Sequence, residues 1–115
     1  MDENEIRAEK ILKQYGFDFC NVSRPEIIGL LNEEISNYQE GSSEYLRILC
    51  GYIFCIGNIA DIELINNAKY SINFDVRCMI DGDWIDSVNW RDSTDRSRLV
   101  DEFISYYRHY FDLDN

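Results

Sequence analysis

The stretch Glu44-Tyr-Leu-Arg-Ile-Leu-Cys-Gly-Tyr-Ile-Phe-Cys-Ile-Gly57 decides the fold, because it carries no charged residue after Arg47. A helix that is apolar on every side belongs in the middle of a domain. This one is shorter than the roughly 20 apolar residues needed to cross a bilayer. Ser43 is placed to cap its start, and Gly57 is placed to end it. We therefore expect the rest of the chain to pack around this central helix.

Two helices are predicted before the central one. Residues 3–15 place apolar side chains on one face, and Gly16 follows where a helix would stop. The segment Ser23-Arg-Pro-Glu26 combines an N-cap serine, a proline in the first turn and a glutamate that can reach back to the cap. A second helix is expected from there to about Tyr38.

Three more helices are expected after it, over residues 59–69, over residues 72–88, and from Ser93 or Thr94 to Phe111. Gly82 could split the second of them, because glycine in a helix costs roughly 1 kcal/mol relative to alanine. The alternation typical of strands is absent. The sequence therefore predicts one all-α domain of about six helices, arranged either as a HEAT-like α-solenoid or as a compact irregular bundle.

The charge of the chain separates the classes of possible partner. Among 115 residues there are 22 acidic and 11 basic ones, which gives a formal net charge of −11. Nucleic acids and anionic membranes would be repelled by most of this surface, whereas a basic protein would be attracted. We therefore expect a basic protein as partner, with no direct nucleic-acid or membrane binding.

The first residues of the chain predict the cellular compartment, and the compartment predicts the state of the cysteines. Residues 1–5 are acidic and precede no apolar run, so no signal peptide is predicted and a cytoplasmic location is expected. In that compartment the cysteines are expected as reduced thiols. They are Cys20, Cys50, Cys55 and Cys78.

Catalytic and metal-binding patterns are weak. His109 is the single histidine, and Cys50 and Cys55 lie in the central helix, where a thiol would be inert. These two cysteines are five positions apart, so their sulfurs point to different helix faces and do not suit zinc. Residues 81–86 lack an oxygen ligand and a glycine where a calcium loop requires them. We predict no metal, no cofactor and no enzymatic activity.

Asp81 stands out as a polar residue in an apolar pattern. If residues 72–88 are helical, Asp81 shares a face with Cys78 and Ile85. A buried carboxylate needs a partner, and Arg77 is the nearest candidate. Two roles stay open for Asp81: it holds a neighbouring helix, or it contacts another protein.

Acidic residues gather in two segments. Residues 25–46 contain five acids and no base, and residues 78–90 contain three acids and no base, with Trp84 and Trp90 beside them. Aromatic anchors surrounded by charge are typical of interface hot spots. The predicted partner-binding residues are Asp75, Asp81, Asp83, Trp84, Asp86, Trp90 and Asp92, with a second patch at Glu33, Glu34 and Glu40.

A motif series in residues 45–84 resembles a family of small acidic helical proteins. The residues that carry it are Leu46-Arg-Ile-Leu-Cys50, Phe54, Gly57-Asn58, Asp61, Ile65, Ala68-Lys69, Asn73-Phe-Asp75, Cys78 and Ile80-Asp81. That family consists of immunity proteins from bacterial polymorphic-toxin and contact-dependent growth inhibition loci. The resemblance implies a HEAT-like fold and an inhibitor that binds its cognate toxin domain, often a basic nuclease. Residues 82–86 are more acidic than the family pattern, and the last helix carries no matching motif.

Three functional hypotheses follow. The first is an immunity protein that covers a basic toxin domain through its acidic surface. The second is a HEAT-like adaptor without a toxin partner, which would bind through exposed aromatic residues of the last helix; the candidates are Tyr106, Tyr107 and Tyr110. The third is a small enzyme that uses Asp81 in a cleft.

Overall fold

The computed structural model describes residues 2–113, and this part of the chain contains six α-helices and no strand. The helices are α1 (Glu3–Tyr15), α2 (Arg24–Ser36), α3 (Ser43–Ile56), α4 (Ile62–Ser71), α5 (Phe74–Met79) and α6 (Thr94–Tyr110). Four short 3₁₀ turns join them: η1 (Phe19–Asn21), η2 (Ile59–Asp61), η3 (Gly82–Trp84) and η4 (Ser87–Trp90). The all-α prediction is confirmed.

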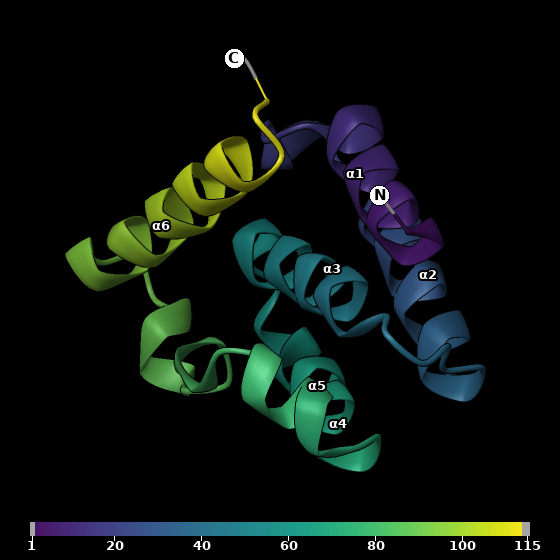
Figure 1. Cartoon of the computed structure of the whole chain (residues 1–115). Helices are drawn as coiled ribbons and strands as arrows, with labels where there is room; N and C mark the ends of the chain where they lie inside the picture. Colours follow the sequence, from purple (N-terminus) through teal and green to yellow (C-terminus); the bar gives the residue numbers. More distant parts are fainter. Residues whose placement is uncertain (1, 114–115) are drawn as a thin grey trace.

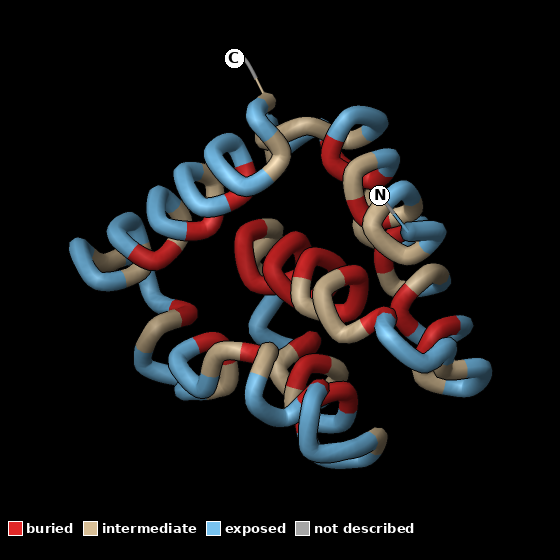
Figure 2. Tube along the Cα trace, viewed as in Figure 1, coloured by how far each residue is buried: buried red, intermediate tan, exposed pale blue. Residues whose placement is uncertain are grey.

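Helix α3 occupies the centre of the molecule, as its sequence predicts. Figure 1 shows α1 and α2 on one side of it, α4 and α5 on another, and α6 across a third. Ten of the 14 residues of α3 are buried, which Figure 2 shows as a red core. The helices surround α3 rather than stacking in a row, so the architecture is the compact irregular bundle.

The ends of α3 match the prediction at one side only. Gly57 ends the helix with a φ of 87°, in the left-handed region that glycine tolerates best. At the start, the N-cap position falls on Ser42 instead of Ser43, and the Ser42 side chain does not cap the helix. Its hydroxyl donates a 2.7 Å hydrogen bond to Glu34 on α2, so it joins two helices.

The Phe103 ring of α6 reaches the backbone of α3 because Gly51 has no side chain. A Cβ atom on Gly51 would lie only 2.1 Å from Cε1 of Phe103. The Phe103 ring also makes edge contacts with Tyr52, Trp84 and Tyr107, at centroid distances of 5.8, 5.9 and 5.1 Å. These rings form an aromatic cluster that joins α3, η3 and α6.

The predicted helix over residues 72–88 is wrong in extent, because α5 ends at Met79. Ile80 takes an extended conformation there. The buried ammonium of Lys69, on α4, donates hydrogen bonds to the carbonyl oxygens of Arg77 (2.6 Å) and Ile80. A side chain from a neighbouring helix thus occupies the carbonyls at which α5 stops.

The residues after α5 form two 3₁₀ turns, each started by an aspartate. The Asp81 carboxylate accepts the N–H of Asp83 at 2.9 Å, and the Asp86 carboxylate accepts the N–H of Val88 at 3.2 Å. Such short side-chain to backbone hydrogen bonds compete with a continuous helix. A Cβ at Gly82 would meet nothing within 4 Å and its φ is not positive, so the turn conformation itself does not require glycine there.

Within residues 2–113, no helix combines the length and the apolar character that crossing a membrane requires.

The Gly51 contact predicts a large effect from a single methyl group. Gly51→Ala should lower the free energy of unfolding by about 1–3 kcal/mol, because the added Cβ overlaps the Phe103 ring. The measurement is chemical denaturation followed by circular dichroism.

Gly29→Ala is the matched control, because Gly29 lies within α2 and a Cβ there would meet nothing within 4 Å. It should raise the free energy of unfolding by roughly 0.5–1 kcal/mol through helix propensity. Two substitutions with the same sign would show that the close approach of α6 is absent.

Candidate partner-binding surface

The two tryptophans predicted as interface anchors are buried. Trp84 is 2% exposed and Trp90 is 7% exposed. The Trp90 indole N–H donates a 2.9 Å hydrogen bond to the Trp84 carbonyl oxygen, and both rings pack against Phe54 of α3. Neither indole is available to a partner, so the prediction of tryptophan anchors is wrong.

The buried tryptophans instead fix the position of residues 81–95, which we call the acidic segment. Arg96 holds it from the other side: its guanidinium donates hydrogen bonds to the carbonyl oxygens of Phe54 (2.6 Å) and Asn89 (3.4 Å). The Asn89 side chain in turn donates to the carbonyl oxygen of Asp83 at 3.0 Å. These contacts tie the acidic segment to α3 and α6.

Two predicted site residues in the acidic segment have structural roles. Asp81 does not lie within an apolar helical stripe, because the helix has already ended; its carboxylate caps η3, as that of Asp86 caps η4. Arg77 is not its partner in the described structure, since the hydrogen bonds of Asp81 are local. Asp81 therefore has a structural role, but a local one: it caps η3 and, within the described residues, does not hold a neighbouring helix, which was the first of the two roles left open.

The other acids are exposed. Asp83 and Asp92 lie on the surface, and within residues 2–113 no side-chain hydrogen bond or ion pair engages their carboxylates. Asp75 is exposed in the first turn of α5. Asp95, which the sequence analysis did not select, is exposed in the first turn of α6. Asp83 and Asp95 both act electrostatically on Arg98.

Of the second predicted patch, Glu33, Glu34 and Glu40, one residue is buried and two are exposed. Glu34 is 4% exposed and belongs to the core: its carboxylate accepts hydrogen bonds from Arg7 (2.9 and 3.2 Å), Ser42 (2.7 Å) and the Gln39 N–H (3.2 Å). Its selection as a surface residue is wrong. Glu33 and Glu40 are exposed.

The environment of Glu34 sets its charge state. Burial alone would raise the pKa of the Glu34 carboxyl, but hydrogen bonds from Arg7, Ser42 and the Gln39 N–H more than offset that effect. The pKa therefore lies below its ordinary value. The ionised form of Glu34 links α1, α2 and the start of α3.

Asp61, one of the residues that carry the family resemblance, also has a structural partner. Its buried carboxylate accepts two hydrogen bonds from the guanidinium of Arg24, both at 2.6 Å. This two-point pairing connects the start of α2 to η2. Packing of the bundle is thus sufficient to explain an acid at this position.

A polar network that the sequence analysis missed lies between α3 and α6. Arg47 donates a 2.6 Å hydrogen bond to the Tyr107 hydroxyl, which donates a 2.9 Å hydrogen bond to Glu44. The Arg47 guanidinium also lies over the rings of Trp84, Tyr106 and Tyr107. Burial raises the pKa of Glu44 above its ordinary value, although Tyr107 and Arg47 act against this.

Two tyrosines of α6 form an exposed aromatic surface beside this network. Tyr106 is 44% exposed and Tyr110 is 48% exposed, and their rings stack at a centroid distance of 5.7 Å. Tyr107, between them in sequence, is buried. Of the three tyrosines named for the adaptor hypothesis, the first and the last therefore face solvent.

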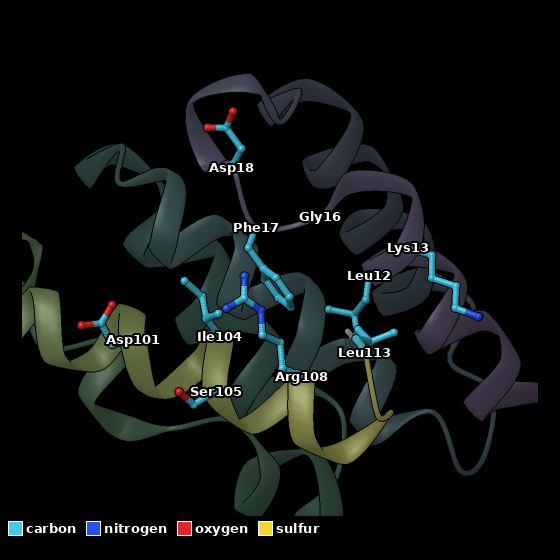
Figure 3. A pocket seen from close by; sticks show the side chains of 10 residues that line it. All are labelled: Leu12, Lys13, Gly16, Phe17, Asp18, Asp101, Ile104, Ser105, Arg108 and Leu113. Atoms are coloured by element: carbon cyan, nitrogen blue, oxygen red, sulfur yellow. The ribbon is translucent and has the colours of Figure 1, made fainter. Parts of the chain in front are cut away.

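A groove of about 870 Å³ lies between α1 and α6. Figure 3 shows Arg108 projecting into it beside Phe17, with the guanidinium 5.3 Å from the ring centroid. Lys13, Asp18 and Asp101 line it as well, so its charge is mixed. Asp81 is not among its lining residues, so this groove is not the cleft that the enzyme hypothesis requires.

The cysteines of the central helix are buried, as the sequence predicts. Burial raises the pKa of Cys55 to about 12 and raises that of Cys50 further, so both thiols stay protonated at neutral pH. His109 is exposed on α6. Over residues 2–113, no group of three or more histidine, cysteine, aspartate or glutamate side chains is arranged to hold a metal ion.

Comparison with known proteins gave no match: no family model fits the chain, and no curated protein or solved structure is detectably similar to it. The resemblance to immunity proteins therefore stays a hypothesis.

The buried Glu34 predicts a pH-dependent stability. Glu34→Gln should lower the free energy of unfolding at pH 7 by about 1–3 kcal/mol, because Arg7 loses a charged partner. The folded-state pKa of Glu34 lies below the ordinary value of 4.5, so its contribution is present above that pH. It is lost as the pH falls through the folded-state pKa. Denaturation curves at several pH values test this.

Glu33→Gln, at the neighbouring exposed position, is the control and should change stability by less than about 0.5 kcal/mol. A difference between wild type and Glu34→Gln that stayed constant at acidic pH would contradict the assignment.

Proposed function

We propose that this chain is a protein-binding module for a basic protein and, more specifically, a cytoplasmic immunity protein that covers a cognate toxin domain. The observation that carries the proposal is the acidic segment. It holds five acids and one base, exposes Asp83, Asp86, Asp92 and Asp95, and rests on two buried tryptophans.

A surface of this kind suits a basic partner for two physical reasons. Exposed carboxylates beside a net charge of −11 attract a positively charged protein over distance and raise its association rate. The acidic segment is also held in place by the Trp84, Trp90 and Arg96 contacts. Binding therefore costs little conformational entropy, because the segment is already ordered in the free protein.

A nuclease domain is the favoured kind of toxin partner. Proteins that bind nucleic acid carry lysine and arginine side chains against the phosphate backbone. An acidic protein that covers those side chains competes directly with the nucleic acid. The family resemblance described above supports the same class of partner.

The exposed tyrosines favour a second candidate function, that of an adaptor. Stacked Tyr106 and Tyr110 present aromatic rings to solvent on α6, and exposed aromatic residues are frequent in protein interfaces. In this role the acidic segment would serve solubility alone. The two candidates differ in which substitutions abolish binding.

The decisive test is a toxicity rescue. The chain is co-expressed with the product of the reading frame immediately upstream in its native locus, and growth and complex formation are measured. The proposal predicts rescue and a stable complex. Unrelieved toxicity, or an upstream product without toxicity and without binding, would contradict the immunity role.

Charge reversal locates the contact. Asp83→Lys combined with Asp92→Lys should slow association with the toxin domain at least about tenfold at low salt, since both carboxylates are exposed and neither caps a helix. Glu26→Lys combined with Glu63→Lys is the matched control, because it alters the net charge equally at two other exposed positions. Stopped-flow association kinetics give the readout.

The control should retain most of the association rate, and the effect of the Asp83 and Asp92 reversal should shrink at high ionic strength. Equal slowing in both double variants would mean that net charge, and not the acidic segment, governs binding. Unchanged binding in both, with loss in a tyrosine variant of α6, would favour the adaptor.

A further inference from the structure

The Arg47 network shows how this protein holds a guanidinium group. The Cζ atom of Arg47 lies 4.7, 5.1 and 5.2 Å from the ring centroids of Tyr106, Trp84 and Tyr107. A carboxylate, that of Glu44, completes the arrangement through the Tyr107 hydroxyl. Aromatic faces with a nearby carboxylate form a favourable site for a guanidinium.

The aromatic stack continues outward beyond Arg47. Tyr106 stacks on Tyr110 with an interplanar angle of 24°, so Arg47, Tyr106 and Tyr110 form a series that we call the tyrosine ladder. The last ring, Tyr110, is nearly half exposed. Over residues 2–113, no cation lies over the Tyr110 ring, whereas the exposed Tyr70 already carries both Lys69 and Arg77.

Three carboxylates act electrostatically on the Tyr110 ring. Burial raises the pKa of the Tyr110 phenol, and the charges of Glu44, Glu5 and Asp2 raise it further, so these carboxylates act on this ring from two other helix starts. Asp2 caps α1 through the Glu5 N–H, but its charge remains. Tyr110 thus presents an accessible aromatic ring on which the charges of three carboxylates act.

We propose that the outer end of the tyrosine ladder binds an arginine side chain of the basic partner, whose guanidinium lies on the Tyr110 ring as the Arg47 guanidinium lies on Tyr106. This site rests on the proposed function in requiring a basic protein partner. It adds a second contact and a preference for arginine over lysine. Arginine is favoured because its planar guanidinium stacks on aromatic rings and is more weakly hydrated than an ammonium group.

Trp84 belongs to both structures. Its ring lies under Arg47 at the inner end of the ladder, and its backbone belongs to η3 in the acidic segment. Trp84 therefore connects the inner end of the ladder to the acidic segment, whereas Tyr110 lies at the opposite end of α6 from Asp95. A basic protein that extends from the acidic segment along the length of α6 would place an arginine on Tyr110.

The test compares two short labelled peptides, one of alternating glycine and arginine and one of alternating glycine and lysine, by fluorescence anisotropy at about 0.15 M salt. The wild type should bind the arginine peptide about threefold more tightly than the lysine peptide. Tyr110→Ala should remove this preference. Tyr110→Phe should retain it, because the aromatic ring is kept.

Tyr70→Ala is the matched control and should keep the preference, since Tyr70 is equally exposed and already has cations of the chain over its ring. Equal binding of the two peptides by the wild type, or a preference that survives in Tyr110→Ala, would overturn the arginine site. Loss of the preference in Tyr70→Ala as well would also overturn it.

The same peptides separate this inference from the proposed function. Asp83→Lys combined with Asp92→Lys should weaken both peptides alike and leave the preference for arginine intact. If that double variant has no effect while Tyr110→Ala removes the preference, the arginine site stands and the acidic segment is not the partner surface. If the double variant weakens binding of both peptides and Tyr110→Ala changes nothing, the acidic segment is the partner surface and the arginine site does not exist.

Discussion

The contact of the Phe103 ring with the backbone at Gly51 is the constraint on which the structure depends. Helix α3 has no charged residue after Arg47, so it must be enclosed, and at this contact the Phe103 ring of α6 covers the α3 backbone. The same ring touches Trp84 and Tyr107. One aromatic cluster therefore positions both the acidic segment, through Trp84, and the Arg47 network, through Tyr107.

The sequence predicted the centre of this fold better than its later part. The apolar character of α3 and the glycine at its end are local properties, so they could be read directly. The helix expected over residues 72–88 failed for two other reasons. Asp81 and Asp86 bond to nearby backbone N–H groups, and Lys69 reaches across from α4. The spacing of apolar residues cannot reveal either the aspartate hydrogen bonds or the Lys69 contact.

Burial explains why the predicted site was only partly placed at the surface. Tryptophans beside acids can be surface anchors or core residues, and here Phe54 and Phe103 enclose Trp84. The sequence does not distinguish Glu34 from its neighbour Glu33. Glu34 is buried because it pairs with Arg7, which lies 27 residues earlier in the chain. Tyr106, Tyr107 and Tyr110 were all candidates for exposed aromatic residues, and only the structure shows that Tyr107 is buried. Asp83 and Asp92 do lie on the surface, and their binding role stays a prediction.

The central claim is that both tryptophans anchor the acidic segment to the core and do not contact the partner. Tryptophan fluorescence with acrylamide quenching, measured with and without a bound basic partner, tests it most directly. The account predicts weak quenching and a blue-shifted emission maximum, both unchanged on binding. Strong quenching in the unbound protein that disappears when the partner binds would contradict it, because the indoles would then be surface anchors.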